Sequence, residues 1–508
     1  MISRRSRTSN ESRTGLAFNR LGRAQVALSL VAFALLVPSA AQANVPLTQI
    51  SQDPFTNPTS QHATEVEPGA SAFGSTIVAS FQDGRFFSGG GATGIGFATS
   101  SNSGATWTHG SLPLTKLSGG GFDRASDPVA AYDAKDGVWL ISALTIDKGL
   151  TGSLLVPPGE PAVVVSRSTD GGLTWSKPVG VVNGPDQGSF DKPWITCDNT
   201  PTSPFYGRCY EQWTYFGGCG HVELSTSTDG GLTWGPVDTP ANGGSETGGQ
   251  PLVQPDGTVV VPITGGCQQN SLRVFRSLDG GETWSALTRV DAIRWHTVAG
   301  GFRPHYVWPS AAVDATGKIY VAWWDCRFRA NCSSNDIVFT TSTDGVNWSP
   351  VMRIPIDPVT SSVDHFISGL GVDRATSGAS AHLGLTYYYY PDTNCDSTTC
   401  QLDVGFVSSA NGGATWSAPL QLAGPMNLSW LANTATGHMV GEYISTPFTA
   451  DGLAHGVFAA ANPPSGGLLD EATYTTKRGI AAAGGTAATS PNGVVFTGTT
   501  GNDYTPDP

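Results

Sequence analysis

Residues that could do chemistry recur at one kind of position, a polar or aromatic residue that is followed in most cases by proline. The first two, Glu67 and Asp127, are carboxylic acids, and a carboxyl pair is the minimum for ordinary glycoside hydrolysis. Proline is tolerated as the first residue of a strand because its missing N–H is not needed there. Each position should therefore open a short strand, and the series recurs at steps of roughly 60 residues with a longer last step: Glu67-Pro68, Asp127-Pro128, Lys192-Pro193, Gln250-Pro251, Trp308-Pro309, Asp364-His365 and Glu442-Tyr443.

Six copies of a short string must build the elements that position these residues. The string S-x-(D/N)-x-G-x-T-W begins at residues 100, 168, 227, 277 and 409, and a form one residue shorter begins at 342. Asp or Asn accepts hydrogen bonds from the following amides, glycine supplies a positive φ, and tryptophan buries its ring under the turn. The starts are 68, 59, 50, 65 and 67 residues apart, which is room for four short strands and their loops.

Composition agrees with an all-β chain. The sequence has 64 Gly and 34 Pro in 508 residues, long helix-period patterns are absent, and short β-rich runs are separated by Gly, Asp and Asn turns.

The six strings resemble the Asp-box, or BNR, repeats of the sialidase superfamily, and the resemblance covers nearly the whole chain after residue 43. It implies a β-propeller of four-stranded blades with Asp-box turns, for which we favour seven blades and keep six as the alternative. We expect one domain over residues 44–508, with Val45–Ser51 adding a strand to the last blade. In this superfamily the innermost strands start at the ligand-binding face, so the opening positions should ring the central channel.

Sialidases hold the substrate carboxylate with three arginines, since a guanidinium matches a carboxylate and stays charged. Asp83-Gly84-Arg85 matches the E-G-R string of the family, which makes Arg85 a substrate-binding candidate. Glu67 stands where the first family arginine is expected, and the position near Gly265-Gly266 has no arginine. The triad is therefore not reproduced, and Arg303 and Arg327 are the alternative cations. For each arginine a structural ion pair is the competing interpretation.

The resemblance also implies a tyrosine nucleophile backed by a carboxylate, and an acid/base aspartate. Tyr443 falls late in the chain, as the family tyrosine does. Its neighbour Glu442 should point to the opposite face of a strand, so Glu246 is the better-placed partner. The alternative is that Tyr443 is a structural residue, and that Glu67 and Asp127 only accept hydrogen bonds at the channel mouth. The catalytic candidates are thus Tyr443, Asp127, Glu67 and Glu246, and the substrate-binding candidates are Arg85, Arg303, Arg327, Trp308, Lys192 and Gln250.

Aromatic side chains are expected near the same strand ends, where they could stack on sugars or pack between blades: Trp194, Trp213, Tyr215, Trp308 and Tyr387–Tyr390. The leading functional hypothesis is a sialidase-like glycoside hydrolase acting on terminal acidic sugars. The alternatives are a propeller polysaccharide lyase or another glycosidase, and a non-catalytic propeller that binds glycans or proteins. The sugar, the linkage and the retaining or inverting outcome stay open.

The N-terminus predicts export. An arginine-rich start, the apolar run Ala24–Val37 and the A-x-A site Ala41–Ala43 are typical of a signal peptide over residues 1–43. The apolar run is too short to span a membrane, so we expect a secreted protein, extracellular or periplasmic. In an exported chain eight cysteines predict four disulfides, paired locally as Cys197–Cys209, Cys219–Cys267, Cys326–Cys332 and Cys395–Cys400.

Charge and ligand spacing exclude other partners. The chain has 27 Lys and Arg against 40 Asp and Glu, a formal charge of −13, which argues against a nucleic-acid partner. The histidines lack metal-ligand spacing, so we expect no transition metal and no cofactor. Structural calcium stays open, although no EF-hand string is present. We expect a monomer whose partner is a glycan or polysaccharide.

Overall fold

Strands and loops make up almost all of the structure, a computed structural model that describes residues 45–147, 157–265, 270–303, 306–485 and 487–488. These residues belong to one unit, residues 43–508. The predicted signal peptide lies outside the described residues. Within the described part of the chain the helices are short 3-10 turns, and none is long and apolar enough to cross a membrane.

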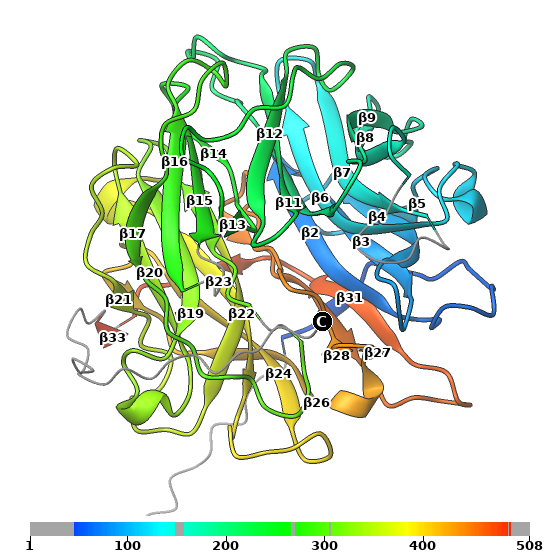
Figure 1. Cartoon of the computed structure of the whole chain (residues 1–508). Helices are drawn as coiled ribbons and strands as arrows, with labels where there is room; N and C mark the ends of the chain where they lie inside the picture. The colour runs from blue at the N-terminus through cyan, green and yellow to red at the C-terminus, as the bar shows by residue number, and fades with distance from the viewer. Residues whose placement is uncertain (1–44, 148–156, 266–269, 304–305, 486, 489–508) are drawn as a thin grey trace, which may run out of the picture. The chain divides into compact units, whose positions relative to one another are not determined.

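Five sheets follow one another along the chain, each built from antiparallel neighbours (Figure 1). The first has eight strands, namely β2 (Glu65–Phe73), β3 (Thr76–Arg85), β4 (Ala92–Ser100), β5 (Thr108–Ser111), β6 (Arg124–Asp133), β7 (Val138–Ile146), β8 (Pro161–Ser168) and β9 (Val179–Asn183). The second has three, namely β10 (Ser189–Cys197), β11 (Cys209–Phe216) and β12 (His221–Ser227).

The third sheet has five strands, and the fourth and fifth have four each. The third contains β13 (Glu246–Thr247), β14 (Leu252–Val253), β15 (Val259–Gly265), β16 (Ser271–Ser277) and β17 (Thr288–Ala292). The fourth contains β18 (Ser310–Val313), β19 (Ile319–Asp325), β20 (Asp336–Ser342) and β21 (Met352–Arg353). The fifth contains β22 (Asp364–Val372), β23 (Leu383–Tyr390), β24 (Gln401–Ser409) and β26 (Leu420–Asn427).

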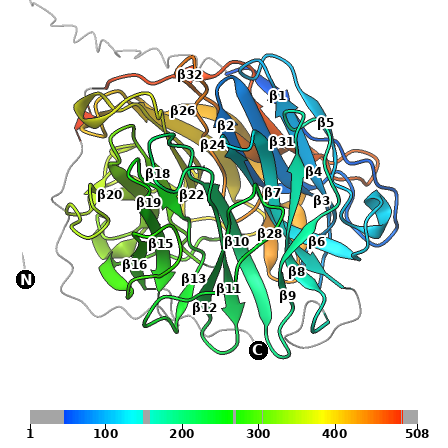
Figure 2. The same ribbon diagram turned by 90° about the horizontal axis from the view of Figure 1, so that it is seen from above.

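A closing sheet joins the two ends of the described chain. Its strands are β1 (Leu47–Gln49), β31 (Glu471–Thr476) and β30 (Val457–Ala461), in that order. Leu47 lies opposite Thr476 in the antiparallel pair of β1 and β31, and the two strands lie side by side in Figure 2. The N-terminal segment therefore adds a strand at the end of the chain, as expected. Three two-stranded pairs complete the structure: β25 (Thr415–Trp416) with β33 (Ala487–Ala488), β27 (Ala432–Thr434) with β28 (Gly437–Met439), and β29 (Leu453–Ala454) with β32 (Ile480–Ala481).

The structure is an all-β β-propeller. The predicted number of blades, seven with six as the alternative, is wrong. Counted as successive sheets, the propeller has five blades of unequal size. One cause is the pair Ala92 and Ala125, through which β4 and β6 merge two expected blades into one sheet. The other is that the last expected opening position, Glu442-Tyr443, lies outside the named strands and is followed by the isolated bridges of Ser445 to Val457 and of Phe448 to Ala454.

The repeated string forms the same hydrogen-bonded turn at all six places, each at the end of a strand. In the third copy Ser227 Oγ accepts from Gly231 N at 2.9 Å, and Asp229 Oδ1 accepts from Thr233 N at 2.9 Å. The corresponding bonds are present in the other five copies. These turns fix the ends of β4, β8, β12, β16, β20 and β24.

Three of the four predicted disulfides lie within the described residues, and all three are formed. They are Cys197–Cys209, Cys326–Cys332 and Cys395–Cys400. Cys219 is also disulfide-bonded, but its predicted partner Cys267 lies outside the described residues. The first pair sits in register across β10 and β11, so it pins the end of one inner strand to its neighbour.

Candidate functional site

Three inner strands turn a charged side chain inward through the same local distortion. Glu67, Asp127 and Lys192 have φ values of 59°, 51° and 55°, in the left-handed region that residues other than glycine rarely adopt. At each of them the register of the strand shifts against its neighbour, as in a β-bulge. Bulges redirect side chains and often lie next to functional sites. The sequence predicted these residues as strand openers, but the bulge is what points them into one place.

A fourth bulge shows that the sequence series is three residues out of step in β22. Ile367 has a φ of 46° at the register shift of β22, so it occupies the place of Glu67 in its own strand. The expected residues Asp364 and His365 come earlier in β22. Charged groups at these places therefore come from β2, β6 and β10 and not from β22.

The inward side chains meet at a cavity of about 150 Å³. The charged residues that line it are Glu67, Arg85, Asp127, Asp191, Lys192 and Arg303. Five of these were predicted as site residues, and the cavity brings them together from β2, β3, β6, β10 and the loop before β18. Glu67 and Asp127 are almost fully buried, with 1% and 3% of their surface exposed.

Lys192 and Arg303 are held by acids. The Nζ of Lys192 lies 3.1 Å from Asp127 Oδ2 and 2.5 Å from Glu442 Oε2, and the Nη2 of Arg303 lies 2.7 Å from Glu442 Oε1. Glu442 therefore bridges two cations. Its neighbour Gly441, at φ 123°, makes this possible, because a Cβ there would lie 2.5 Å from the Cα of Glu67.

Arg85 differs from these two cations. Its Nη1 donates to Gln82 Oε1 at 3.1 Å and to the carbonyl of Gly91 at 2.6 Å. The ion pairs found among the described residues include none to Arg85, and its Nε has no hydrogen-bond partner there. Arg85 is thus a buried guanidinium whose charge no carboxylate of the described chain neutralises directly.

Neutral and small polar groups connect the two central acids. Gln82 Nε2 donates to Glu67 Oε2 and, at 3.2 Å, to Ser126 Oγ. Ser126 Oγ donates in turn to Asp127 Oδ1 at 2.6 Å. The second oxygen of Glu67, Oε1, is buried and has no partner among the described residues, so it can carry a proton without breaking a hydrogen bond.

Electrostatics separates the two acids. Burial, together with the nearby Asp127, raises the pKa of Glu67 to about 8, with Lys192 opposing the shift. Burial also raises the pKa of Asp127, but Lys192 and the hydrogen bond from Ser126 outweigh it and hold that pKa below its ordinary value. Glu67 is therefore protonated at neutral pH while Asp127 is ionised. Two carboxyl groups with pKa values pushed apart are the usual arrangement of an acid and its partner.

Glu442 and Asp191 follow the same rules. Burial raises the pKa of Glu442, but Lys192 and Arg303 outweigh it and hold that pKa at about 2. Burial raises the pKa of Asp191 to about 7, with Asp127 adding to the effect and Lys192 opposing it. The cavity therefore carries carboxyl groups in both protonation states near neutral pH.

Tyr443 and Glu246 do not line this cavity. The hydroxyl of Tyr443 donates to the carbonyl of Pro128 at 3.1 Å, and its ring makes an edge contact with Trp194. Burial holds the pKa of Tyr443 well above its ordinary value, so the geometry gives it a structural place. Glu246 forms an ion pair of 2.9 Å with Arg273.

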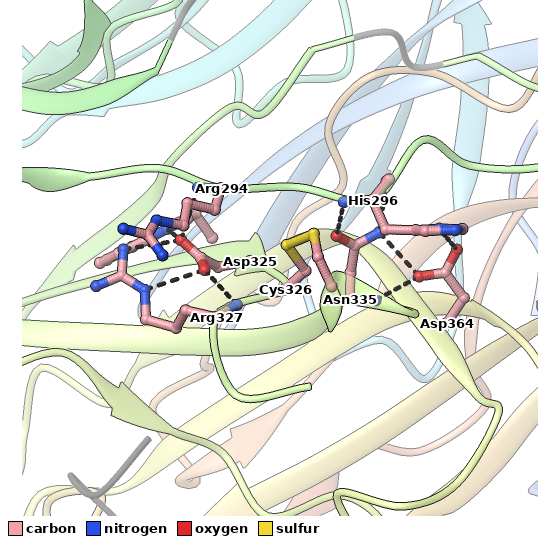
Figure 3. Close-up of a disulfide and its surroundings, with 9 residues drawn as sticks. Arg294, His296, Asp325, Cys326, Arg327, Asn335 and Asp364 are labelled. Carbon is pink, nitrogen blue, oxygen red and sulfur yellow. Dashed lines mark hydrogen bonds and ion pairs between the residues drawn. A yellow bond between two sulfur atoms is a disulfide. The ribbon is translucent and has the colours of Figure 1, made fainter. Parts of the chain in front are cut away.

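Arg327 does not line the cavity, and two acids bind its guanidinium group. Its Nη2 lies 2.8 Å from Asp325 Oδ2, and its Nη1 lies 3.3 Å from Asp291 Oδ2. Figure 3 shows Arg327 turned onto Asp325, beside the Cys326–Cys332 disulfide. The arginines proposed from the sequence therefore separate: Arg85 and Arg303 share the cavity, and Lys192 is its third cation.

Trp308 lies close to the charged groups of the site, whereas Gln250 contributes to another part of the inner strands. The Nζ of Lys192 lies 5.8 Å from the ring centre of Trp308, within the range of a cation–π contact. Gln250 Oε1 accepts from Ala311 N at 2.9 Å. Gln250 lines a second and larger cavity, of about 580 Å³, along the other parts of the inner strands. That cavity is the larger one, but the acids with separated pKa values are not in it.

Four residues of the cavity network were not among the sequence candidates: Gln82, Ser126, Asp191 and Glu442. Ser126 and Asp191 each precede an opening residue, and strand alternation would turn them away. The bulges cancel this alternation, which is why the pattern could not reveal them. Glu442 was judged a poor partner for Tyr443, and its carboxylate indeed binds Lys192 and Arg303.

The described residues offer one preformed group of potential metal ligands, Asp336, Asp357 and His365. Both aspartates already bind guanidinium groups, since Asp336 lies 2.6 Å from Arg329 and 2.8 Å from Arg353, and Asp357 lies 2.7 Å from each of the same two arginines. Two buried cations occupy the place of an ion, so these residues do not fit a metal.

Together the fold and the cavity define a class: an all-β propeller with a buried acid–carboxylate pair among three cations. No protein-family model matches the chain. A curated relative, a xyloglucanase from a Paenibacillus species, is 30% identical over 237 residues, which are 44% of this chain and 21% of the xyloglucanase. The match spans about a fifth of that protein's length.

Solved structures extend the likeness over more of the chain. An ulvan lyase, described as a new family of polysaccharide lyase, has a TM-score of 0.50 at 10% identity, covering 86% of this chain and 97% of its own. A Hadza microbial sialidase has a TM-score of 0.45 at 19% identity and covers 64% of each chain. The NanB sialidase from Streptococcus pneumoniae has a TM-score of 0.42 at 13% identity, covering 84% of this chain and 70% of its own. At such identities the ulvan lyase likeness supports the fold alone.

Proposed function

We propose that this protein is an exported carbohydrate-active propeller, and that it hydrolyses terminal acidic sugars as a sialidase-like glycoside hydrolase. The observation that carries the proposal is that Glu67 and Asp127 line one cavity beside the unpaired cation Arg85, and the opposite directions of their pKa shifts support it. The repeated turns are then Asp boxes, and the names of the similar proteins, which act on glycans, support the same general class.

In this proposal Arg85 receives the carboxylate of the sugar. Lys192 and Arg303 already have internal partners, so a ligand carboxylate gains most at the guanidinium that lacks one. A buried arginine favours a carboxylate because both are planar and the guanidinium stays charged. The sugar displaces no existing ion pair when it binds there.

Glu67 donates the proton and Asp127 assists from its carboxylate. The proton of Glu67 passes to the glycosidic oxygen as the bond from that oxygen to the sugar carbon breaks, which releases the leaving group as an alcohol. Asp127 then either forms a bond to the sugar carbon or removes a proton from an attacking water molecule. Tyr443 contributes by holding the backbone that follows Asp127, through its bond to Pro128.

A polysaccharide lyase is the second candidate, favoured by the crowding of Arg85, Lys192 and Arg303 around Asp127. A lyase must neutralise a uronate carboxylate while a base removes the neighbouring proton, and an ionised Asp127 beside cations could serve as that base. Bond cleavage then produces an unsaturated sugar. The fold shared with the ulvan lyase is compatible with this chemistry.

The experiment is an activity assay with isosteric variants. Purified protein is incubated with a fluorogenic sialoside, and separately with uronic-acid polysaccharides while ultraviolet absorbance is followed. For a hydrolase we expect turnover of the sialoside and a loss of 10²–10⁴-fold, roughly, in Glu67→Gln and Asp127→Asn. The matched controls are Glu282→Gln and Asp136→Asn, whose side chains are exposed, and they should keep full activity.

The outcomes separate the candidates. Ultraviolet-absorbing product without sialoside turnover supports the lyase. Glycan-array binding that persists in Glu67→Gln and Asp127→Asn, with no turnover of any substrate, supports a non-catalytic glycan-binding propeller and overturns the proposed enzyme. We further propose that the protein acts outside the cytoplasm as a monomer; its disulfides agree with the location.

A further inference from the structure

A second group of acids lies where the closing sheet meets the first sheet, apart from the residues of the cavity. It consists of Glu65 at the start of β2, Asp83 near the end of β3 and Glu471 at the start of β31. Their exposed fractions are 2%, 0% and 0%. Carboxyl groups are rarely buried to this degree unless a cation or several donors compensate them.

The backbone brings the three residues close to one another. Glu65 and Asp83 are directly opposite in the register of β2 and β3, so their side chains project from the same face. Glu471 joins them because it forms a bridge with Thr64, the neighbour of Glu65, and its N–H donates to the carbonyl of Ala63 at 2.9 Å. These contacts link β31, the middle strand of the closing sheet, to the first sheet.

The donors found around these acids are too few for three charges. Glu65 Oε2 accepts from Ser51 Oγ at 2.8 Å, and Glu471 Oε2 accepts from Ala432 N at 2.7 Å. Both oxygens of Asp83, Oε1 of Glu65 and Oε1 of Glu471 have no hydrogen-bond partner among the described residues. Asp83 is thus a wholly buried side chain, without a partner in the described chain, that faces Glu65.

Basic side chains do not supply the missing charge. None of the ion pairs between described residues includes Glu65, Asp83 or Glu471, and the imidazole of His62, three residues before Glu65, is held by Asp53 at 2.8 Å. Burial, assisted by neighbouring carboxyl groups, raises the pKa of Glu65 to about 8 and holds the pKa values of Asp83 and Glu471 well above their ordinary values. Without a cation, burial therefore favours the protonated form of all three groups.

We propose that Glu65, Asp83 and Glu471 bind a calcium ion that fastens the closing sheet to β2 and β3. Calcium accepts six to eight oxygen ligands in flexible arrangements, and carboxylates are its preferred protein ligands. Ser51 Oγ, which also accepts from Thr473 N at 2.8 Å, is a neutral oxygen beside them. The preformed group at Asp336 is more compact than these three carboxylates, so their side chains must rotate when the ion binds.

The choice of calcium over magnesium follows from the same geometry. Magnesium requires a nearly ideal octahedron at short distances and gives up its water reluctantly. Here the ligands come from three strands and their carboxylates can bind through one or both oxygens. Calcium accepts that variety, so it should stabilise the protein more than magnesium at equal concentration.

The test compares calcium binding and thermal unfolding of the whole protein and of Asp83→Asn. Protein treated with EDTA and dialysed is titrated with calcium chloride by calorimetry, and Tm is measured with calcium, with magnesium and with neither. We expect calcium to raise the Tm of the unsubstituted protein by about 2 °C or more. Asp83→Asn should bind one ion fewer per chain and lose this rise, while its Tm without calcium stays the same or increases because a buried carboxyl group is removed.

The matched control is Asp403→Asn, which removes another buried carboxyl group, held by Gln421 at 2.6 Å outside this cluster. It should keep the calcium-dependent rise. An unchanged Tm of the unsubstituted protein with calcium overturns the site, as does a rise that survives in Asp83→Asn. Should Asp83→Asn not fold, Glu471→Gln replaces it, since its amide oxygen can still accept from Ala432. None of these readouts depends on activity, so they test the site independently of the proposed function.

Discussion

Removing the charge of Lys192 is the sharpest test of how the cavity is held together. In Lys192→Met the side chain keeps most of its apolar stem but loses the ammonium group between Asp127 and Glu442. Asp127 then has no cation within ion-pair distance among the described residues, since Lys192 is its one partner there. Glu442 keeps Arg303. The variant therefore leaves one buried carboxylate without a cation partner and another with half of its partners.

The magnitude follows from the distances. At an effective dielectric constant of about 20, charges 3.1 Å and 2.5 Å apart attract by about 5 and about 7 kcal/mol. Burial of the groups offsets much of this attraction in the native protein. The substitution leaves a buried carboxylate without its cation. Breaking a buried ion pair in this way costs about 3–5 kcal/mol of unfolding free energy. We expect a loss in that range, together with a clear fall in Tm.

The sign of the pH dependence adds a second readout. In the unsubstituted protein the pKa values of Asp127 and Glu442 lie below their ordinary values, so their stabilisation is present above pH 5, roughly, and is lost only as the pH falls through the folded pKa. Without Lys192, burial dominates and the pKa of Asp127 rises. In the variant, ionisation of the buried Asp127 destabilises the folded state as the pH increases through this higher pKa. The loss of unfolding free energy in Lys192→Met should therefore be larger at about pH 8 than at about pH 5.

The assay is urea unfolding at those two pH values, followed by tryptophan fluorescence. Adding Asp127→Asn to Lys192→Met should recover part of the loss, because the unpaired charge is gone while Ser126 can still donate to the amide oxygen. The control is Lys116→Met, whose partner Asp123 lies at 2.7 Å but on the surface; its midpoint should not change measurably. If Lys192→Met unfolds at the midpoint of the unsubstituted protein, or if its deficit is the same at both pH values, the ion-pair account of the cavity is refuted.

Three further outcomes follow from individual residues. Substituting Asp229 by Ala removes the acceptor of Thr233 N in one repeated turn and should lower stability by about 1–2 kcal/mol, a change that differential scanning calorimetry can measure. Gly371→Ala places a Cβ 1.7 Å from the carbonyl oxygen of Thr446, so the soluble yield and the Tm should both fall sharply. Activity that uses Glu67 as proton donor should persist below and disappear above a pH of about 8; a rate that keeps rising as the pH increases beyond that value would exclude the role.

The sequence predicted the parts of the fold that depend on local chemistry. The repeated string predicted its turn hydrogen bonds, because the Ser and Asp side chains accept from backbone N–H groups only a few residues away. The disulfides that the described residues can show were predicted for the same reason, since the cysteines in each pair are near in sequence. The number of sheets was not predictable in this way. It depends on the contact of Ala92 with Ala125, two small residues that carry no signal of pairing.

The candidate site was predicted in part. Glu67, Asp127 and Lys192 were found because proline marks the place where an inner strand begins. Tyr443 was proposed as the nucleophile only because of the family resemblance. The resemblance could not predict that its hydroxyl donates to the carbonyl of Pro128. For Arg327 the nearby Asp325 indicated an ion pair, which the structure contains. The bridging place of Glu442 depends on the close approach of Gly441 to Glu67, a distance that no pattern of residue types encodes.

The left-handed backbone at Glu67, Asp127 and Lys192 has a conformational cost, but it directs each side chain into the cavity. A residue with a side chain carries a conformational cost at a positive φ that glycine avoids, so glycine at any of these positions should relax the backbone. The same change would remove a charged group from the cavity. At Glu67, which is in none of the ion pairs found among the described residues, selection for heat resistance alone would therefore tend to favour glycine, whereas selection for turnover would keep the side chain. At Asp127 and Lys192 the ion pair between the two side chains opposes that tendency. An engineer could use this opposition, because each position accepts a new side chain with its direction already set by the main chain.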